Sequence, residues 1–117
     1  MAAYTVQTVT EAGVTPTYTA VSASDTFTPA AADYDKPHIL HVKNAGGSPD
    51  SVVIDDASSL SNAPGATAYN PDLTISVTNA QERFIRLAPV RRYLQSNGTV
   101  VVTNSFTTSV TAAVFVA

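Results

Sequence analysis

The chain has 117 residues, no cysteine and no tryptophan, and only 13% of its residues are charged. Its net charge is −3 with six Lys and Arg, which excludes the broad basic surface that neutralises nucleic-acid phosphates. The lack of cysteine excludes disulfides, thiolate metal sites and thiol nucleophiles, and the length is usual for a single domain over residues 1–117.

The first residues, Met1-Ala-Ala-Tyr-Thr-Val-Gln-Thr8, have neither the basic start nor the apolar stretch of a signal peptide. No apolar run approaches the roughly 20 residues that cross a bilayer, so we expect a soluble protein made in the cytoplasm without a membrane partner. Residues 1–14 are interpreted in two ways, as an extended arm that adds a strand to a neighbour or as the first strand of this domain. We expect deletion of residues 2–12 to leave a folded domain.

Short β-prone segments follow one another along the chain, separated by turn residues such as Asn44-Ala-Gly-Gly-Ser-Pro49. Apolar residues alternate with polar ones, as at Leu73, Ile75 and Val77. This pattern predicts an all-β, single-domain antiparallel β-sandwich, Ig-like or jelly-roll-like, with about eight short strands. The predicted strands cover residues 4–9, 17–21, 26–28, 38–42, 51–54, 73–77, 84–87, 99–103 and 110–116.

Two segments interrupt this rhythm. Residues 56–72 form a long polar connection, which is interpreted either as a functional loop or as a mobile one. Residues 88–98 contain Pro89, which favours a helical turn over residues 90–94, and Asn97-Gly98, which predicts a tight turn. Asn97-Gly98-Thr99 also matches a glycosylation sequon, but the hairpin turn is the better explanation for it.

The two histidines, His38 and His41, invite a metal-site interpretation. On a strand, residues three apart point to opposite faces, so the two rings would not act as a ligand pair. We therefore expect no metal site, with one histidine at the sheet surface and the other near the edge of the core.

Carboxylates occur as the pairs Asp33-Tyr-Asp35 and Asp55-Asp56, which lack the further oxygen ligands of a calcium loop. Turn capping explains them, although a glycosidase pair is not excluded by sequence. No nucleophile elbow, phosphate-binding loop or dinucleotide fingerprint is present. We therefore expect a protein that is not an enzyme and has no cofactor. A small enzyme would instead need a pocket that unites His38 or His41 with Asp55.

Four of the six basic residues fall within ten positions. Arginine is favoured at protein interfaces because its planar fork pairs with carboxylates and stacks on aromatic rings. One interpretation is an electropositive sheet edge that meets an acidic partner, and the other is a set of solvated charges with intramolecular Arg–Asp bridges. We expect charge reversal at Arg91 and Arg92 to weaken assembly without disturbing the fold. The candidate contact residues are Arg83, Arg86, Arg91, Arg92, Tyr93, Tyr4 and Tyr18.

Segments spread over nearly the whole chain resemble one group of viral proteins. They are Ala12-Gly-Val-Thr-Pro-Thr-Tyr-Thr-Ala20, Ser24-Asp-Thr-Phe27, Leu40-His-Val-Lys-Asn44, Ala68-Tyr-Asn-Pro-Asp-Leu73, Gly98-Thr-Val-Val-Val-Thr103 and Ser109-Val-Thr-Ala-Ala-Val114. With these segments the chain resembles the small proteins encoded beside the major capsid protein in tailed bacteriophages, particularly those of actinobacterial hosts.

The resemblance implies a capsid decoration protein, a β-sandwich on the exterior of the virion that binds the lattice of the major capsid protein. It also implies a homo-oligomer, with a trimer favoured, and no catalytic residues. The alternative is a carbohydrate- or host-binding module of a phage tail or fibre. Such a module would use the loop of residues 56–72, where Tyr69 is the single aromatic residue.

Overall fold

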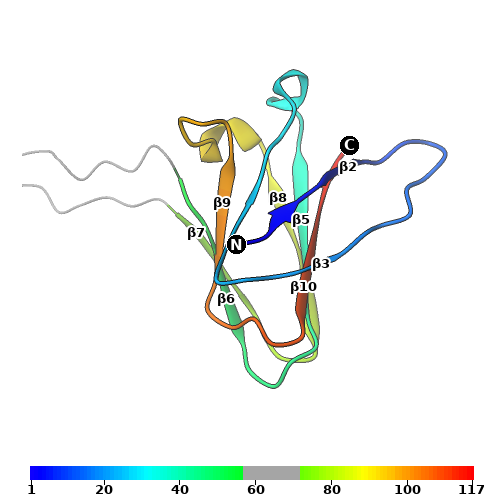
Figure 1. Ribbon diagram of the computed structural model, residues 1–117. Coiled ribbons are helices and arrows are strands. Elements are labelled where there is room, and N and C mark those ends of the chain that lie inside the picture. The colour runs from blue at the N-terminus through cyan, green and yellow to red at the C-terminus, as the bar shows by residue number, and fades with distance from the viewer. Residues whose placement is uncertain (57–71) are drawn as a thin grey trace, which may run out of the picture.

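The computed structural model describes residues 1–56 and 72–117. The chain forms two β-sheets that lie against each other, as Figure 1 shows, and the predicted all-β sandwich is confirmed. One sheet has the strand order β1-β4-β9-β6-β7, and the other has the order β2-β10-β5-β8 with β3 also paired to β10. No helix in the described ranges is long and apolar enough to cross a membrane.

Ten strands and two short 3₁₀ helices make up the described chain. The strands are β1 (Ala3–Tyr4), β2 (Val6–Thr8), β3 (Thr19–Ala20), β4 (Ser24–Phe27), β5 (His38–Asn44), β6 (Asp50–Ile54), β7 (Leu73–Val77), β8 (Gln81–Leu87), β9 (Val100–Asn104) and β10 (Val110–Val116). The 3₁₀ helices are η1 (Ala31–Asp33) and η2 (Val90–Tyr93), the second of which was predicted as a helical turn.

Strands β3 to β10 are paired as one long antiparallel hairpin wrapped into two sheets. β3 pairs with β10, β4 with β9, β5 with β8, and β6 with β7. In addition, β5 pairs with β10 within one sheet, and β6 pairs with β9 within the other. Such nested pairing of eight strands is the arrangement of a jelly roll, so of the two predicted topologies the jelly roll fits and the Ig-like order does not.

The N-terminal segment is part of both sheets. β1 pairs in parallel with β4, and after Thr5 the chain passes to the other sheet, where β2 pairs in parallel with β10. Tyr4 is buried in the core, and its hydroxyl donates a hydrogen bond to Asp25. Residues 3–8 therefore provide two strands of this domain, one in each sheet, rather than a free arm. We now expect deletion of residues 2–12 to destabilise the fold, since it removes a buried aromatic side chain.

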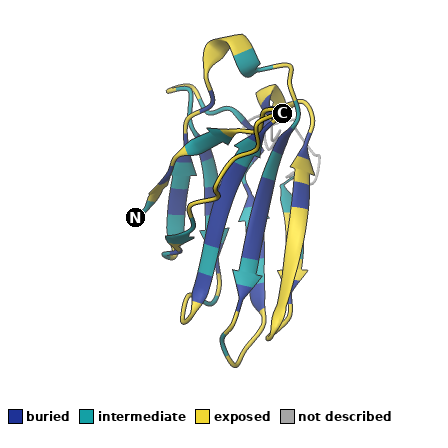
Figure 2. Cartoon of the chain, turned by 90° about the vertical axis from the view of Figure 1, so that its right-hand side faces the viewer, coloured by how far each residue is buried: buried dark blue, intermediate teal, exposed yellow. Residues whose placement is uncertain are grey.

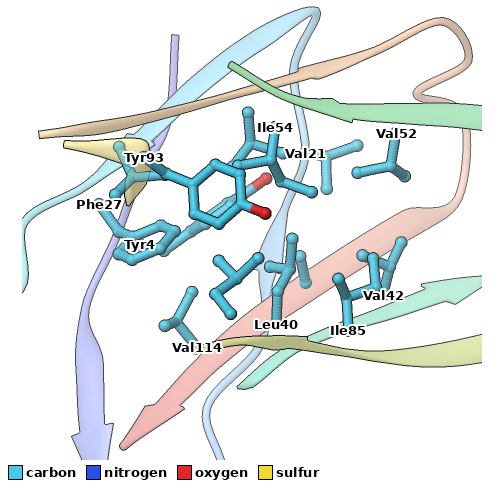
Figure 3. Packing of buried hydrophobic residues seen from close by; sticks show 14 of the residues in the cluster. Tyr4, Val21, Phe27, Leu40, Val42, Val52, Ile54, Ile85, Tyr93 and Val114 are labelled. Atoms are coloured by element: carbon cyan, nitrogen blue, oxygen red, sulfur yellow. The ribbon is translucent and has the colours of Figure 1, made fainter. Parts of the chain in front are cut away.

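The core lies between the sheets and consists mainly of valine, leucine and isoleucine from alternating strand positions. Figure 3 shows Tyr4, Phe27 and Tyr93 grouped at one end of this aliphatic core. β-Branched residues fill strands well because their side chains pack on a pleated surface. In β10, for example, Val110, Val114 and Val116 all point inward and are buried.

Candidate interaction surface

The outer face of the β2-β10-β5-β8 sheet carries an unusual set of side chains. Because strand residues alternate between faces, His38, Leu40 and Val42 of β5 point into the core. The intervening residues of β5 point to the outer face, as do the corresponding residues of β8 and β10. The outward set comprises Ile39, His41, Lys43, Glu82, Phe84, Arg86, Thr111, Ala113 and Phe115.

An aromatic stack occupies the middle of this face. The rings of His41 and Phe84 are stacked with their centroids 3.9 Å apart, and Tyr18 meets His41 edge-on at 5.4 Å. The opposite neighbour of His41 in the sheet is Ala113, whose small side chain leaves room for these rings. Such pairs stabilise beyond their buried area, so His41 links the three rings into one cluster.

Hydrogen bonds hold the imidazole of His41 from both sides. Nδ1 of His41 is 2.8 Å from the hydroxyl of Tyr18, and Nε2 is 3.2 Å from Oε1 of Glu82. The ammonium of Lys43 lies over the ring of Tyr18, 4.1 Å from its centroid, which adds a cation–π contact. His41 is consequently buried although it lies on the outer face of the sheet.

Phe84 is the most exposed part of the stack. Its side chain is 68% exposed, which is rare for a phenylalanine, and one ring face is turned away from His41. A neighbouring row places Phe115, Ile39 and Arg86 side by side on β10, β5 and β8. Figure 2 shows this sheet, with an edge strand that is exposed along most of its length. We call the side chains of Tyr18, Ile39, Phe84, Arg86 and Phe115 the aromatic face.

The four predicted arginines divide into two pairs. Nε of Arg91 lies 3.2 Å from Oδ1 of Asp35, and Nε of Arg92 lies 2.6 Å from Oδ2 of Asp56. For these two, the intramolecular interpretation is right. The other two belong to the exposed strand β8 and form no ion pair with a described residue.

The three predicted tyrosines are also separated by the fold. Tyr4 and Tyr93 are buried in the core, so their prediction as contact residues is wrong for the folded chain. Both side chains fill the space between the sheets, where a partner cannot reach them. Tyr18 is half-buried on the aromatic face, next to His41, and can take part in a contact.

The histidines face opposite sides of β5, as the strand pattern predicts. His38 is fully buried, and its Nδ1 lies 3.0 Å from the carbonyl oxygen of Lys36. The ring of His38 also stacks near Phe27, so its surroundings are those of a core residue. Within residues 1–56 and 72–117, no group of three or more His, Asp and Glu side chains could hold a metal ion.

Carboxylates gather where β6 ends and β7 begins. Burial raises the pKa of Asp55, and the neighbouring carboxylates of Asp72 and Asp56 raise it further. The carboxylate of Asp72 accepts a hydrogen bond from the backbone N–H of Asp56. The capping carboxylate here is therefore that of Asp72, whereas the carboxylate of Asp56, for which turn capping was predicted, pairs with Arg92. The predicted sugar-binding residue Tyr69, and nearly all of the loop of residues 56–72, lie outside the described residues.

Sequence reasoning missed the aromatic face for two reasons. The predicted strand began at Phe84, whereas β8 begins at Gln81, so the pattern of Glu82, Phe84 and Arg86 on one face was not recognised. Tyr18 and His41 are far apart in sequence and meet only through the pairing of β3 with β10 and of β10 with β5.

Comparisons with known proteins give no relative: no protein-family model, no curated protein and no solved structure matches the chain.

Proposed function

We propose that this chain is a non-enzymatic structural protein that binds other protein through the aromatic face. In the specific form of the proposal it is a decoration protein, which attaches to the outside of a phage capsid and stabilises the assembled lattice. The observation that carries the proposal is the aromatic face itself, with its exposed Phe84 supported by the ring of His41.

The composition of this face fits a protein partner. Aromatic residues and arginine are enriched at the centres of protein interfaces, where they contribute most of the binding free energy. Phe84 and Arg86 lie on regular strands, so the face loses little conformational entropy on binding. Phe115 and Ile39 extend the apolar area across two further strands.

The fold gives a second, weaker support. Jelly rolls occur in viral capsid and lectin domains, although one fold serves many functions. A protein that binds the assembled lattice better than the free subunits stabilises it in proportion to RT ln(1 + [L]/Kd). The decoration role therefore requires a stable scaffold and one contact surface, and the aromatic face is the surface that we propose for it.

The experiment is co-sedimentation with empty capsids assembled from the major capsid protein of the same genome. We expect the wild-type chain to pellet with capsids in a saturable manner. Phe115→Ser should weaken binding about tenfold or more, because Phe115 belongs to the aromatic face and lies two strands away from the sheet edge formed by β8.

The control is Val14→Ser, which also removes an apolar side chain, here an exposed one in the projecting segment between β2 and β3. It should bind as the wild type does. A wild-type chain that stays in the supernatant at all capsid concentrations would overturn the capsid proposal. Binding to immobilised glycans instead, lost in Phe115→Ser, would assign the face to a host-binding module.

A further inference from the structure

The two sides of the sandwich differ in how their sheet edges are covered. On one side, β1 covers the edge of β4, while β2 and β3 together cover that of β10. On the other side, the described residues provide no strand that pairs with the outer edges of β7 and β8. β8 is the longer of the two, with seven residues, and all of its first four are exposed. An open strand edge of this length is a template for pairing with another strand.

We propose that two copies of this chain associate edge to edge through β8, as antiparallel strands related by a two-fold axis at Phe84. In such a pair, directly opposed residues share a face, so the axis must pass through a residue and not between two. Phe84 is the middle residue of β8. With the axis there, all seven residues from Gln81 to Leu87 find an opposite residue.

The charges on the outer face of β8 fit this register. Glu82 and Arg86 lie two residues before and two after Phe84, so Glu82 of each copy faces Arg86 of the other. The register thus creates two cross-strand ion pairs, one on either side of the Phe84 pair. Such pairs stabilise a sheet, whereas like charges directly opposite destabilise it.

The centre of the pairing is apolar. Phe84 of one copy meets Phe84 of the other, and each ring is already supported by the His41 of its own chain. Aromatic cross-strand pairs are among the most favourable ones. The pairing therefore covers part of the largest exposed phenylalanine surface in the described chain.

The remaining positions are compatible with the same register. Arg83 of each copy faces Ile85 of the other on the inner side, where the aliphatic stem of the arginine can cover the isoleucine. Gln81 faces Leu87. No two cations are directly opposed.

Neighbouring registers are less favourable. With the axis at Ile85, Phe84 faces Arg86 and Glu82 faces Ala88, which lies beyond the end of β8. With the axis at Arg83, the two Arg83 guanidinium groups oppose each other and Glu82 faces Phe84. Only the axis at Phe84 opposes Glu82 with Arg86, and so charge complementarity selects it.

The inference does not rest on the proposed function, because it concerns the free chain in solution. It also differs from the trimer implied by the resemblance, since a two-fold edge pairing closes with two copies. The β2-β10-β5-β8 sheets of the two copies would become one continuous sheet with two adjoining aromatic faces.

The first test is the mass of the full chain in solution by analytical ultracentrifugation, without capsids. We expect a dimer in reversible equilibrium with the monomer. Glu82→Arg should raise the dissociation constant at least tenfold, because it opposes two arginines at each end of the pair. Arg86→Glu should do the same, and the double variant Glu82→Arg/Arg86→Glu should restore dimerisation.

The control for charge reversal is Arg91→Glu, which changes the charge equally but lies outside β8 and has the exposed partner Asp35. Its dissociation constant should equal that of the wild type. A wild-type monomer or trimer over the micromolar range would overturn the inference, as would a double variant that fails to recover.

A second test uses the absence of cysteine from the chain. In Phe84→Cys, the only thiols are opposed across the two-fold axis, so mild oxidation should give a disulfide-linked dimer in high yield. Ser76→Cys, on the exposed surface of β7, is the matched control and should form little disulfide-linked dimer. Equal cross-linking of the two variants would contradict the register.

Discussion

The hydroxyl of Tyr4 lies 2.5 Å from Oδ2 of Asp25, and this hydrogen bond ties the N-terminal segment to the interior of the sandwich. Asp25 is fully buried and also accepts hydrogen bonds from the backbone N–H groups of Ala2 and Ser22. Burial alone would raise the pKa of Asp25, but the hydrogen bonds from Ser22 and Tyr4 outweigh it and hold the pKa below its ordinary value. Burial and the bond to Asp25 raise the pKa of Tyr4, which keeps its proton.

Removal of this hydroxyl should destabilise the fold. Tyr4→Phe leaves a buried carboxylate short of one donor, and we expect a loss of about 1–3 kcal/mol in the free energy of unfolding. Urea denaturation measures it. Tyr34→Phe, at a half-buried position near the surface, is the control and should change stability by less than about 0.5 kcal/mol. Equal effects of the two variants would show that the Tyr4 hydroxyl is not structural.

Two buried carboxyls should give opposite pH dependences. The pKa of Asp25 lies below the ordinary 3.8, so its stabilisation is present above pH 3.8 and is lost as pH falls through its folded pKa. Burial raises the pKa of Asp50, so Asp50 destabilises the fold as pH rises above 3.8, and fully so above its folded pKa.

At pH 7, we therefore expect Asp25→Asn to lower the free energy of unfolding and Asp50→Asn to raise it. Asparagine at position 50 retains the oxygen that accepts the backbone N–H of Phe106. The difference for Asp50→Asn should shrink as the pH falls toward 3.8, whereas the difference for Asp25→Asn should persist to pH 3.8 and shrink only below it. Denaturation at several pH values measures them, and a constant difference for either variant would show that the charge is not the cause.

The two paired arginines should respond differently to charge reversal. Asp56 has no exposed side-chain surface, whereas the side chain of Asp35 is 83% exposed. Arg92→Glu places a second negative charge beside a buried carboxylate, and we expect a cost of about 2 kcal/mol or more. Arg91→Glu should cost much less, because solvent screens the charge. We therefore expect reversal of both charges to destabilise the fold through Arg92, contrary to the prediction from the sequence. Thermal denaturation distinguishes Arg91→Glu from Arg92→Glu, and equal melting temperatures of the two variants would contradict this difference in cost.

Two adjacent glycines should differ sharply. A methyl group at Gly46 would overlap the ring of Phe106 and the carbonyl oxygen of Thr108, whereas a methyl group at Gly47 would meet nothing within 4 Å. Gly46→Ala should lose about 1–3 kcal/mol through overpacking. Gly47→Ala, as the matched control, should stay within about 0.5 kcal/mol of the wild type. Chemical denaturation of both variants provides the comparison.

The strands that alternate cleanly could be predicted from the sequence to the residue. β7 and β10 have the predicted bounds of residues 73–77 and 110–116, because in both the inward side chains are apolar. The predicted β8 was too short, since its first three residues are polar and exposed on both faces. Propensity does not identify strand residues whose side chains stay outside the core.

The long-range features could not be predicted. Nothing local in the N-terminal sequence shows that the chain changes sheets at Thr5, because parallel pairing depends on where β4 and β10 lie. The stack of Tyr18, His41 and Phe84 brings together three segments that are remote in sequence. Burial of Tyr4 and Tyr93 depends on the same closure of the sandwich, which is why both were mistaken for contact residues.

The interior position of β10 constrains the order in which this protein can fold. β10 pairs with β5 on one side and with β2 and β3 on the other, and nearly the whole chain separates Val6 from its partner Val114. On the ribosome, β2, β3 and β5 emerge early and must wait for a strand that is translated last among the ten. Their unpaired edges are open to other nascent chains during that interval. The sheet that contains β10 is therefore completed only after β10 is translated, although β5–β8 and β6–β7 can pair before it.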